Sequence, residues 1–185
     1  HFLMQAIRWE GKSLHLLDQR ALPTEEQWIV IRTWEDAARA ISDMVVRGAP
    51  AIAITAAYGL ALAVQTGSDR KEAARGLAAA RPTAVNLQWA IERMADLKDE
   101  ELLGEAIHIH QEDIRICREL GAHGASLIRN GVITICNTGS FATGGHGTAL
   151  GIVRSAIEMG QSMHVYALET RPYLQGARLT ATECL

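Results

Sequence analysis

The segment from residue 131 to residue 168 constrains the fold more than any other part of the chain. It begins with the apolar run Gly131-Val-Ile-Thr-Ile135, which breaks into polar residues and then into a glycine-rich stretch. Residues 149–159 carry apolar side chains at helical spacing, and residues 163–168 form a second short apolar run. A strand, a helix and a second strand in this order are typical of a βαβ unit, so the segment predicts a parallel sheet.

Cys136 stands where the first of these strands ends. In a parallel sheet, ligands bind beyond the carboxyl ends of the strands, where helix N-termini also present unpaired N–H groups. A cysteine in this place is a candidate functional thiol or, with equal weight, a small residue that fills the core. The glycines at 139, 144, 145, 147 and 151 do not follow the G-x-G-x-x-G pattern, so the loop gives little support for a dinucleotide site.

The first part of the chain predicts a small antiparallel sheet followed by helices. Short alternating apolar segments within residues 7–22 predict a β-hairpin, and residues 28–32 predict a further strand. Thr33 is a candidate N-cap for a helix with apolar residues at helical spacing, and we expect Gly48 and Pro50 to end that helix.

Apolar spacing predicts four further helices, at residues 51–64, 71–80, 85–94 and 99–129. We expect Thr83 to cap the third of these helices and an interruption of the fourth near Gly121 and Gly124. His108 and His110 lie two positions apart, on different faces of a helix, so we expect both at the surface or in an interface and not in a shared metal site. Asp113 is expected on a solvated face of the same helix.

The segment Arg47-Gly48-Ala49-Pro50 is a second place where chemistry is expected. Proline near the first turn of a helix is the usual N-terminal arrangement, so Gly48 and Ala49 can offer free N–H groups to an anion while Arg47 adds a charged fork. An arginine at the end of a helix is about equally often only a favourable partner for the helix dipole. Spacing alone places Arg81, at a junction between two helices, on the solvated surface.

The composition narrows the class of protein. With 185 residues, of which 48% are hydrophobic, the chain can bury a substantial core in one or two domains. A formal charge of −3 gives no electrostatic reason to bind nucleic acid, and the apolar run at 51–64 is shorter than the roughly 20 residues of a membrane span. The 3 widely spaced cysteines indicate neither a disulfide framework nor a zinc site. We therefore expect a cytoplasmic protein that binds a small molecule.

Several motifs occur together in a specific order and spacing. They are VVRGAPAIAITAAYG at 45–59, RPTAVNL at 81–87, CNTGSFATGGHGTALG at 136–151 and ETRPYLQGARLT at 169–180. With these motifs the chain resembles the methylthioribose-1-phosphate isomerase family of methionine salvage, over nearly its whole length. The wider superfamily includes regulatory subunits of a translation-initiation exchange factor and ribose-1,5-bisphosphate isomerases. These relatives share one architecture, so the fold alone does not separate them.

The resemblance implies an aldose-to-ketose isomerisation of 5-methylthioribose 1-phosphate to 5-methylthioribulose 1-phosphate, in a homodimer and with neither a metal nor a redox cofactor. It implies that Cys136 is the catalytic cysteine. It assigns substrate and phosphate binding to Arg47, Gly48, Ala49, Arg81 and Gln175. The family's catalytic aspartate and a following Asn-Lys pair are expected beyond Leu185.

Two departures from the family pattern keep an alternative open. Ile135 stands where the family usually has a histidine directly before the cysteine, and Leu168 stands where it usually has an acid. The loss of two polar groups favours a non-catalytic subunit that keeps a sugar-phosphate pocket. A ribose-1,5-bisphosphate isomerase is a further alternative.

The resemblance and the patterns together predict an α/β fold in two domains. Residues 1–130 are expected to form an N-terminal domain of a β-hairpin and helices. Residues 131–185 are expected to form the first part of a Rossmann-like catalytic domain. Because only two parallel strands are present, we expect the sheet to continue beyond residue 185.

Overall fold

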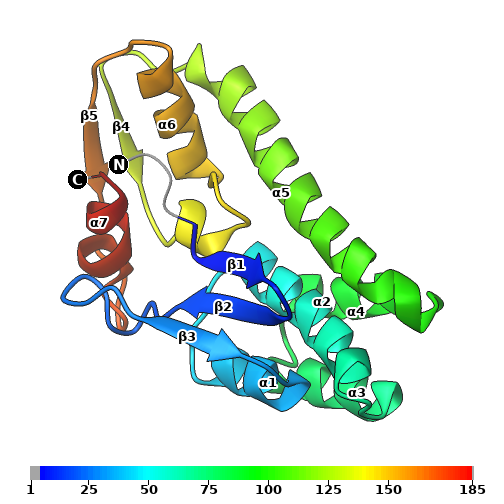
Figure 1. Ribbon diagram of the computed structural model, residues 1–185. Coiled ribbons are helices and arrows are strands. Elements are labelled where there is room, and N and C mark those ends of the chain that lie inside the picture. Colours follow the sequence, from blue (N-terminus) through cyan, green and yellow to red (C-terminus); the bar gives the residue numbers. More distant parts are fainter. Residues whose placement is uncertain (1–4, 185) are drawn as a thin grey trace.

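The structure, a computed structural model, describes residues 5–184. A three-stranded antiparallel sheet lies against a group of helices, and a two-stranded parallel sheet with its own helix lies along the far part of the long helix α5 (Figure 1). The predicted α/β fold class is confirmed. No helix among the described residues is long and apolar enough to cross a membrane.

The antiparallel sheet consists of β1 (Ile7–Glu10), β2 (Ser13–Leu17) and β3 (Trp28–Ile31), in the order β1-β2-β3. Leu14 and Leu16 in the central strand are fully buried. Because side chains two positions apart point to the same face of a strand, both leucines contribute to the core. The predicted hairpin and third strand are confirmed.

The first helix, α1 (Trp34–Ser42), is shorter than predicted. The expected continuation to Gly48 is wrong, because Met44 has a left-handed backbone with a φ of 60° and turns the chain away from the helix axis. The amide of Val45 then donates to the carbonyl of Ala40 at 2.9 Å, which closes the last helical turn. The apolar residues therefore continue at helical spacing beyond Ser42, where the helix ends.

Helix α2 (Ala49–Gln65) is the centre of the core, and every residue from 51 to 63 is buried. It packs against α1, α3 (Arg70–Ala80), α4 (Val85–Met94) and α5 (Leu102–Ala125). The ring of Tyr58 in α2 stacks on Trp9 of the antiparallel sheet, with ring centroids 5.2 Å apart. A helix that is apolar on all sides needs such neighbours around its whole circumference.

The predicted cap of α4 is one residue too early. Ala84, and not Thr83, is the N-cap, and the amide of Gln88 donates to the Ala84 carbonyl at 3.3 Å. No side chain among the described residues caps this helix. Thr83 therefore indicated the start of the helix to within one residue but is not the cap itself.

Helix α5 follows the short 3-10 turn η1 (Asp99–Glu101) and continues through Gly121, where we expected an interruption. A β-carbon on Gly121 would lie 3.0 Å from the carbonyl oxygen of Gly151 and would meet the Ser155 hydroxyl. Both residues belong to α6 (Ala149–Glu158). Gly121 thus allows two helices to approach closely, and the prediction of a break was wrong.

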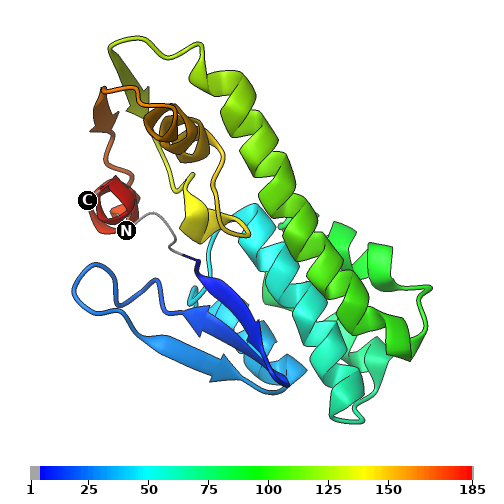
Figure 2. The ribbon, with the colours of Figure 1, turned by 45° about the horizontal axis from the view of Figure 1, so that its top comes forward.

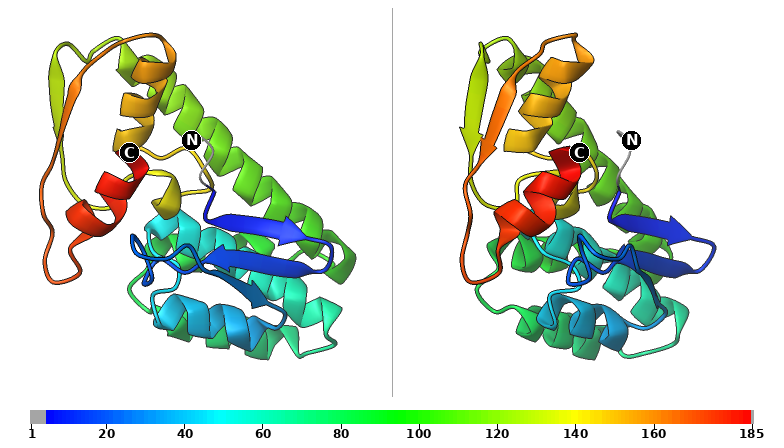
Figure 3. Two further views of the ribbon diagram at one scale, coloured as in Figure 1. Left: turned by 60° about the vertical axis from the view of Figure 1, so that its left-hand side comes forward. Right: turned by 90° about the vertical axis from the view of Figure 1, so that its left-hand side faces the viewer.

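The parallel sheet pairs β4 (Gly131–Thr134) with β5 (His164–Ala167), and α6 connects them. This confirms the predicted βαβ unit. Figures 2 and 3 show α6 between this pair of strands and α5. On the strands, Ile133 and Tyr166 are 68% and 60% exposed. Helix α6 packs against α5, so the two sides of the proposed domain boundary at residue 130 are in contact. The division into two domains therefore stays a prediction.

Candidate functional site

Cys136 follows β4 and begins the loop that leads to the 3-10 turn η2 (Ser140–Ala142). Its thiol is free and exposed, so the alternative that it fills the core is wrong. Its backbone has a φ of 71°, which is uncommon for a residue with a side chain and redirects the chain out of the strand. The carbonyl of Cys136 accepts a hydrogen bond from the Thr180 hydroxyl at 3.3 Å.

The Arg47 side chain meets the segment that follows β5. Its guanidinium carbon lies 5.2 Å from the centroid of the Tyr173 ring, within cation–π distance. With the Gln175 amide oriented to satisfy both of its neighbours, its oxygen accepts from Arg47 Nη2 at 2.9 Å and its nitrogen donates to the Thr170 carbonyl at 2.6 Å. Two of the predicted substrate-binding residues are therefore in direct contact.

The charges around Arg47 bring further predicted residues into the same region. Partial burial lowers the pKa of the Arg47 guanidinium, the nearby Cys136 and Tyr173 side chains raise this pKa, and the positive charges of Arg81 and Arg178 lower it again. The structure thus places Arg47, Arg81, Cys136 and Gln175 within electrostatic or contact range. Neither Tyr173 nor Arg178 was singled out from the sequence, although both lie within the ETRPYLQGARLT motif. Three arginines in one region favour an anionic ligand.

Gly48 and Ala49 form the start of α2 directly after Arg47. Gly48 is the N-cap with a φ of 100°, and no side chain among the described residues caps the helix. Ala49 is exposed. The positive end of the α2 dipole and its first N–H groups therefore lie next to Arg47, where they would add to the attraction for a phosphate.

The N–H groups of the glycine-rich loop are occupied by protein atoms. The amide of Gly144 donates to the Asp113 carboxylate at 2.6 Å, and the amides of Gly145 and Gly147 donate to the Thr143 hydroxyl at 3.3 and 3.0 Å. These three amides are therefore not free to bind an external anion. Asp113, which was expected on a solvated face, is half-buried and bonded to this loop. Burial raises the pKa of its carboxyl, while the bond from Gly144 opposes the rise.

His110 is buried inside the fold, which corrects the prediction of a surface or interface histidine, whereas His108 is exposed as expected. The His110 ring nitrogens lie 3.1 Å from the Tyr58 hydroxyl and 2.8 Å from the Gly144 carbonyl oxygen. Burial lowers the pKa of His110. One signal was available: His110 lies four residues after Ala106 and seven before Cys117, on the buried face of the helix.

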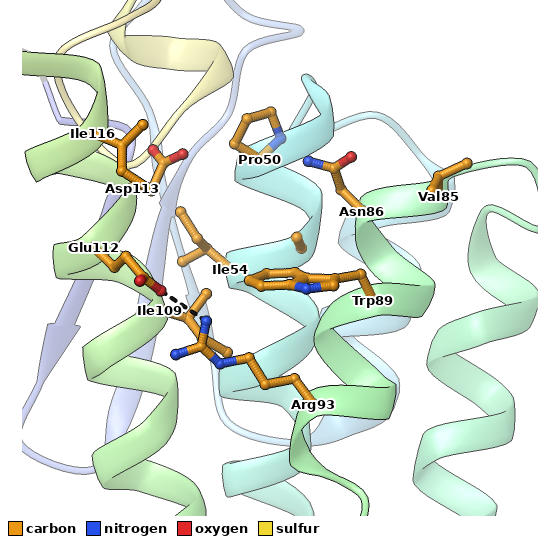
Figure 4. Close-up of a pocket in the computed structure, with 11 residues that line it drawn as sticks. Pro50, Ile54, Val85, Asn86, Trp89, Arg93, Ile109, Glu112, Asp113 and Ile116 are labelled. Carbon is orange, nitrogen blue, oxygen red and sulfur yellow. Dashed lines mark hydrogen bonds and ion pairs between the residues drawn. The ribbon is translucent and has the colours of Figure 1, made fainter. Parts of the chain in front are cut away.

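A separate cleft of about 440 Å³ lies between α2, α4 and α5 (Figure 4). Its wall includes Trp89 and Ile116, and Arg93 crosses its floor to bind Glu112 at 2.7 Å. None of the predicted catalytic or substrate-binding residues lines this cleft. Pro50, which lines this cleft, lies three residues after Arg47 in the sequence.

A sequence profile of the initiation factor 2 subunit family matches residues 45–185. The chain belongs to this family. Within it, the chain is 53% identical to the methylthioribose-1-phosphate isomerase of Alcanivorax borkumensis, over 97% of this chain and 57% of that relative. It is 51% identical to the methylthioribose-1-phosphate isomerase of an Anaeromyxobacter species, over 98% of this chain and 56% of that relative. The chain therefore spans little more than half the length of the curated relatives it matches.

Two solved structures have the same fold as this chain. The 5-methylthioribose 1-phosphate isomerase of Pyrococcus horikoshii is 34% identical with a TM-score of 0.86, over 97% of this chain and 56% of that one. Subunit delta of the translation initiation factor eIF-2B from A. fulgidus is 41% identical with a TM-score of 0.83, over 97% of this chain and 58% of that one. The predicted resemblance to methylthioribose-1-phosphate isomerases and to translation-initiation factor subunits is thus confirmed.

Proposed function

We propose that the chain is the cysteine-bearing part of an isomerase that converts 5-methylthioribose 1-phosphate to 5-methylthioribulose 1-phosphate in methionine salvage. The observation that carries this proposal is the meeting of Arg47 and Gln175, at 2.9 Å, in a region that also contains Cys136. A phosphate-binding group beside an exposed thiol suits a sugar phosphate. Relatives at 53% and 51% identity that are named methylthioribose-1-phosphate isomerases support the choice of substrate.

The reaction requires a bond to break and a hydrogen to move. The phosphate on the anomeric oxygen prevents the sugar from opening as a free hemiacetal does. The bond between C1 and the ring oxygen must break while that oxygen takes a proton, the hydrogen on C2 must reach C1, and the 2-hydroxyl must lose its proton. These steps need a proton-transfer group at the reacting carbons and a site that excludes water.

We assign the proton-transfer role at the sugar to Cys136 and the binding of the phosphate to Arg47, Arg81 and the start of α2 at Gly48 and Ala49. Gln175 fixes the Arg47 fork and offers its own amide to the sugar. A second acid or base is also required, and we place it in the part of the curated relatives that this chain does not span. We further propose that the protein lies in the cytoplasm, which its three free cysteines support. We also propose that it forms a homodimer, which the family resemblance supports.

The direct test is to incubate the full-length protein that contains this chain with 5-methylthioribose 1-phosphate and to follow ketose formation. Ribose 1,5-bisphosphate serves as the competing substrate in the same assay. Turnover of the methylthio sugar with at least tenfold preference over the bisphosphate, about 1.4 kcal/mol of discrimination, is expected. No turnover of either sugar phosphate contradicts the proposal.

A second function is favoured by one specific observation, the 41% identity and TM-score of 0.83 with an eIF-2B delta subunit. On this reading the chain is a non-catalytic subunit that retains the sugar-phosphate pocket. Ligand-induced thermal stabilisation without turnover, together with co-purification in a larger assembly, would favour this function over the isomerase.

A further inference from the structure

The last described segment of the chain, the π-helical turn η3 (Gly176–Thr180) and α7 (Ala181–Cys184), holds the cysteine loop at two points. Figure 3 shows this segment beside the loop that leaves β4. The Thr180 hydroxyl donates to the carbonyl of Cys136 at 3.3 Å, and Thr180 is itself buried. This contact acts on the backbone of the residue that carries the thiol.

The second contact comes from Glu183, whose side chain is 1% exposed. Its carboxylate accepts hydrogen bonds from the Ser140 amide at 2.6 Å, the Ser140 hydroxyl at 2.8 Å and the Phe141 amide at 3.3 Å. Arg154 in α6, with its side chain 8% exposed, donates to the same carboxylate at 3.2 Å. Four donors therefore converge on one buried acid.

The loop leaves little freedom between these two points. Gly139 packs against the Glu183 carboxylate so closely that a β-carbon at this position would overlap it. Cys136 already has a left-handed φ of 71°, which surrounding structure must maintain. On the other side of the loop, Gln19 donates to the Phe141 carbonyl at 2.8 Å. Both ends of the turn from Cys136 to Phe141 are thus fixed by buried polar groups.

We propose that Thr180 and Glu183 are positioning residues that clamp the loop and hold Cys136 in its left-handed conformation. This inference rests on the role of Cys136 in the proposed function. Neither residue is a catalytic residue, because Thr180 is buried and its hydroxyl is bonded to a backbone carbonyl, and the Glu183 carboxylate is enclosed by protein donors. Burial raises the pKa of Glu183 and its four donors oppose that rise, as expected for a carboxylate that is retained for its contacts.

Substitutions at Thr180 test the clamp without a large change in shape. Thr180→Val removes the hydroxyl from a side chain of equal size, and Thr180→Ser retains it. For Thr180→Val we expect kcat to fall by about tenfold with KM within about twofold, the effect of one lost hydrogen bond that acts on the reacting group. Thr180→Ser should restore most of the rate. Equal kcat in Thr180→Val and the wild type would overturn the proposal.

Substitutions at Glu183 test the other end of the clamp by a measurement that needs no substrate. In Glu183→Gln, the amide nitrogen faces donors, so we expect hydrogen exchange at the Ser140 and Phe141 amides to be at least about tenfold faster and kcat to fall by about 10²-fold. Glu105→Gln, which removes a half-buried partner of Arg93 at 2.6 Å in a different part of the fold, is the matched control and should change neither quantity.

The two measurements separate the two proposals. If the wild-type protein does not turn over the sugar phosphate, the proposed function fails, and unchanged amide exchange in Glu183→Gln would still overturn the clamp. If amide exchange increases while kcat stays at the wild-type value, the contacts hold the loop but do not position the thiol, and the proposal is wrong. Faster exchange together with a lower kcat and a constant KM supports it.

Discussion

Gly48 and Ala142 are in backbone contact, and a β-carbon on Gly48 would lie 2.5 Å from the α-carbon of Ala142. Gly48 begins α2 directly after Arg47, and Ala142 belongs to the turn that follows Cys136. This contact therefore brings the proposed phosphate site against the loop of the proposed catalytic thiol. Glycine is required at position 48 both by the contact and by its φ of 100°.

The contact predicts a large effect for Gly48→Ala. We expect the free energy of unfolding to fall by about 3 kcal/mol or more, since a methyl group must displace backbone and also adopt a left-handed conformation. Gly67→Ala is the matched control, because Gly67 has a φ of 73° with no atom within 4 Å, and should cost about 1 kcal/mol. Urea unfolding measures both, and equal costs would show that the contact with Ala142 does not restrict position 48.

Replacing the thiol separates a catalytic cysteine from an exposed one. We expect Cys136→Ala to lower kcat by at least about 10²-fold, the usual contribution of a positioned proton-transfer group, with little change in stability. Cys184→Ala is the control, because Cys184 is also free and exposed. A steady-state assay of ketose formation measures both variants. If Cys136→Ala retains the wild-type rate, the cysteine has no part in the mechanism.

The planar guanidinium of Arg47 predicts that a positive charge alone is not sufficient to bind the phosphate. Arg47→Lys keeps a positive charge but cannot bind Gln175 and a phosphate in one plane, so we expect KM to rise by about tenfold with a smaller change in kcat. Arg75→Lys, at an exposed position of α3, is the control and should leave KM unchanged. A KM for Arg47→Lys equal to that of the wild type would argue against phosphate binding at this residue.

The parts of the fold that the sequence predicted depend on local patterns. The β-hairpin and the βαβ unit could be predicted because apolar residues recur every two positions in a strand and every 3.6 positions in a helix. Each short strand or helix shows this spacing within its own sequence. The end of α1 did not follow, because the left-handed Met44 has no sequence signature in an otherwise continuous apolar pattern. Met44 is neither a glycine nor an asparagine, the residues that usually occupy this conformation.

The polar contacts of the site depend on distant residues, and single patterns do not predict them. His110 meets Tyr58 across 52 positions, Asp113 meets Gly144 across 31, and Glu183 meets Ser140 across 43. Each side chain alone is compatible with a solvated surface. Only the packing of the distant elements against one another shows that these groups are bonded and wholly or partly buried.

The buried His110 predicts that stability falls as the pH falls below about neutrality. Because burial lowers the pKa of His110 from its usual 6.5, the unfolded chain takes up a proton in a range where the folded protein does not. The free energy of unfolding therefore decreases as the pH falls through 6.5 towards the lowered pKa, by up to about 1.4 kcal/mol per pH unit for one group. Burial also lowers the pKa of His146, which acts in the same direction.

Urea unfolding between pH 7.5 and pH 5.5 checks this dependence, and these two pH values bracket the window at roughly one unit on each side of the unfolded histidine pKa. We expect His110→Gln to have a smaller slope of stability against pH, with the remaining slope due in part to His146. His108→Gln, two residues away and exposed, should keep the full slope. An identical slope in His110→Gln and His108→Gln would mean that His110 binds a proton equally well in the folded protein.

Two glycines in α5 predict opposite effects of the same substitution. Gly104 has no atom within 4 Å of an added β-carbon, so Gly104→Ala should stabilise the protein by about 0.5–1 kcal/mol through helix propensity. Gly121→Ala gains the same propensity, but its β-carbon would meet Ser155 and lie 3.0 Å from the Gly151 carbonyl oxygen. We expect a net loss of about 1–3 kcal/mol, because α5 and α6 must separate to admit the methyl group. Thermal unfolding of both variants decides whether Gly121 is present for helix packing: a stabilised Gly121→Ala would contradict the close approach of the two helices.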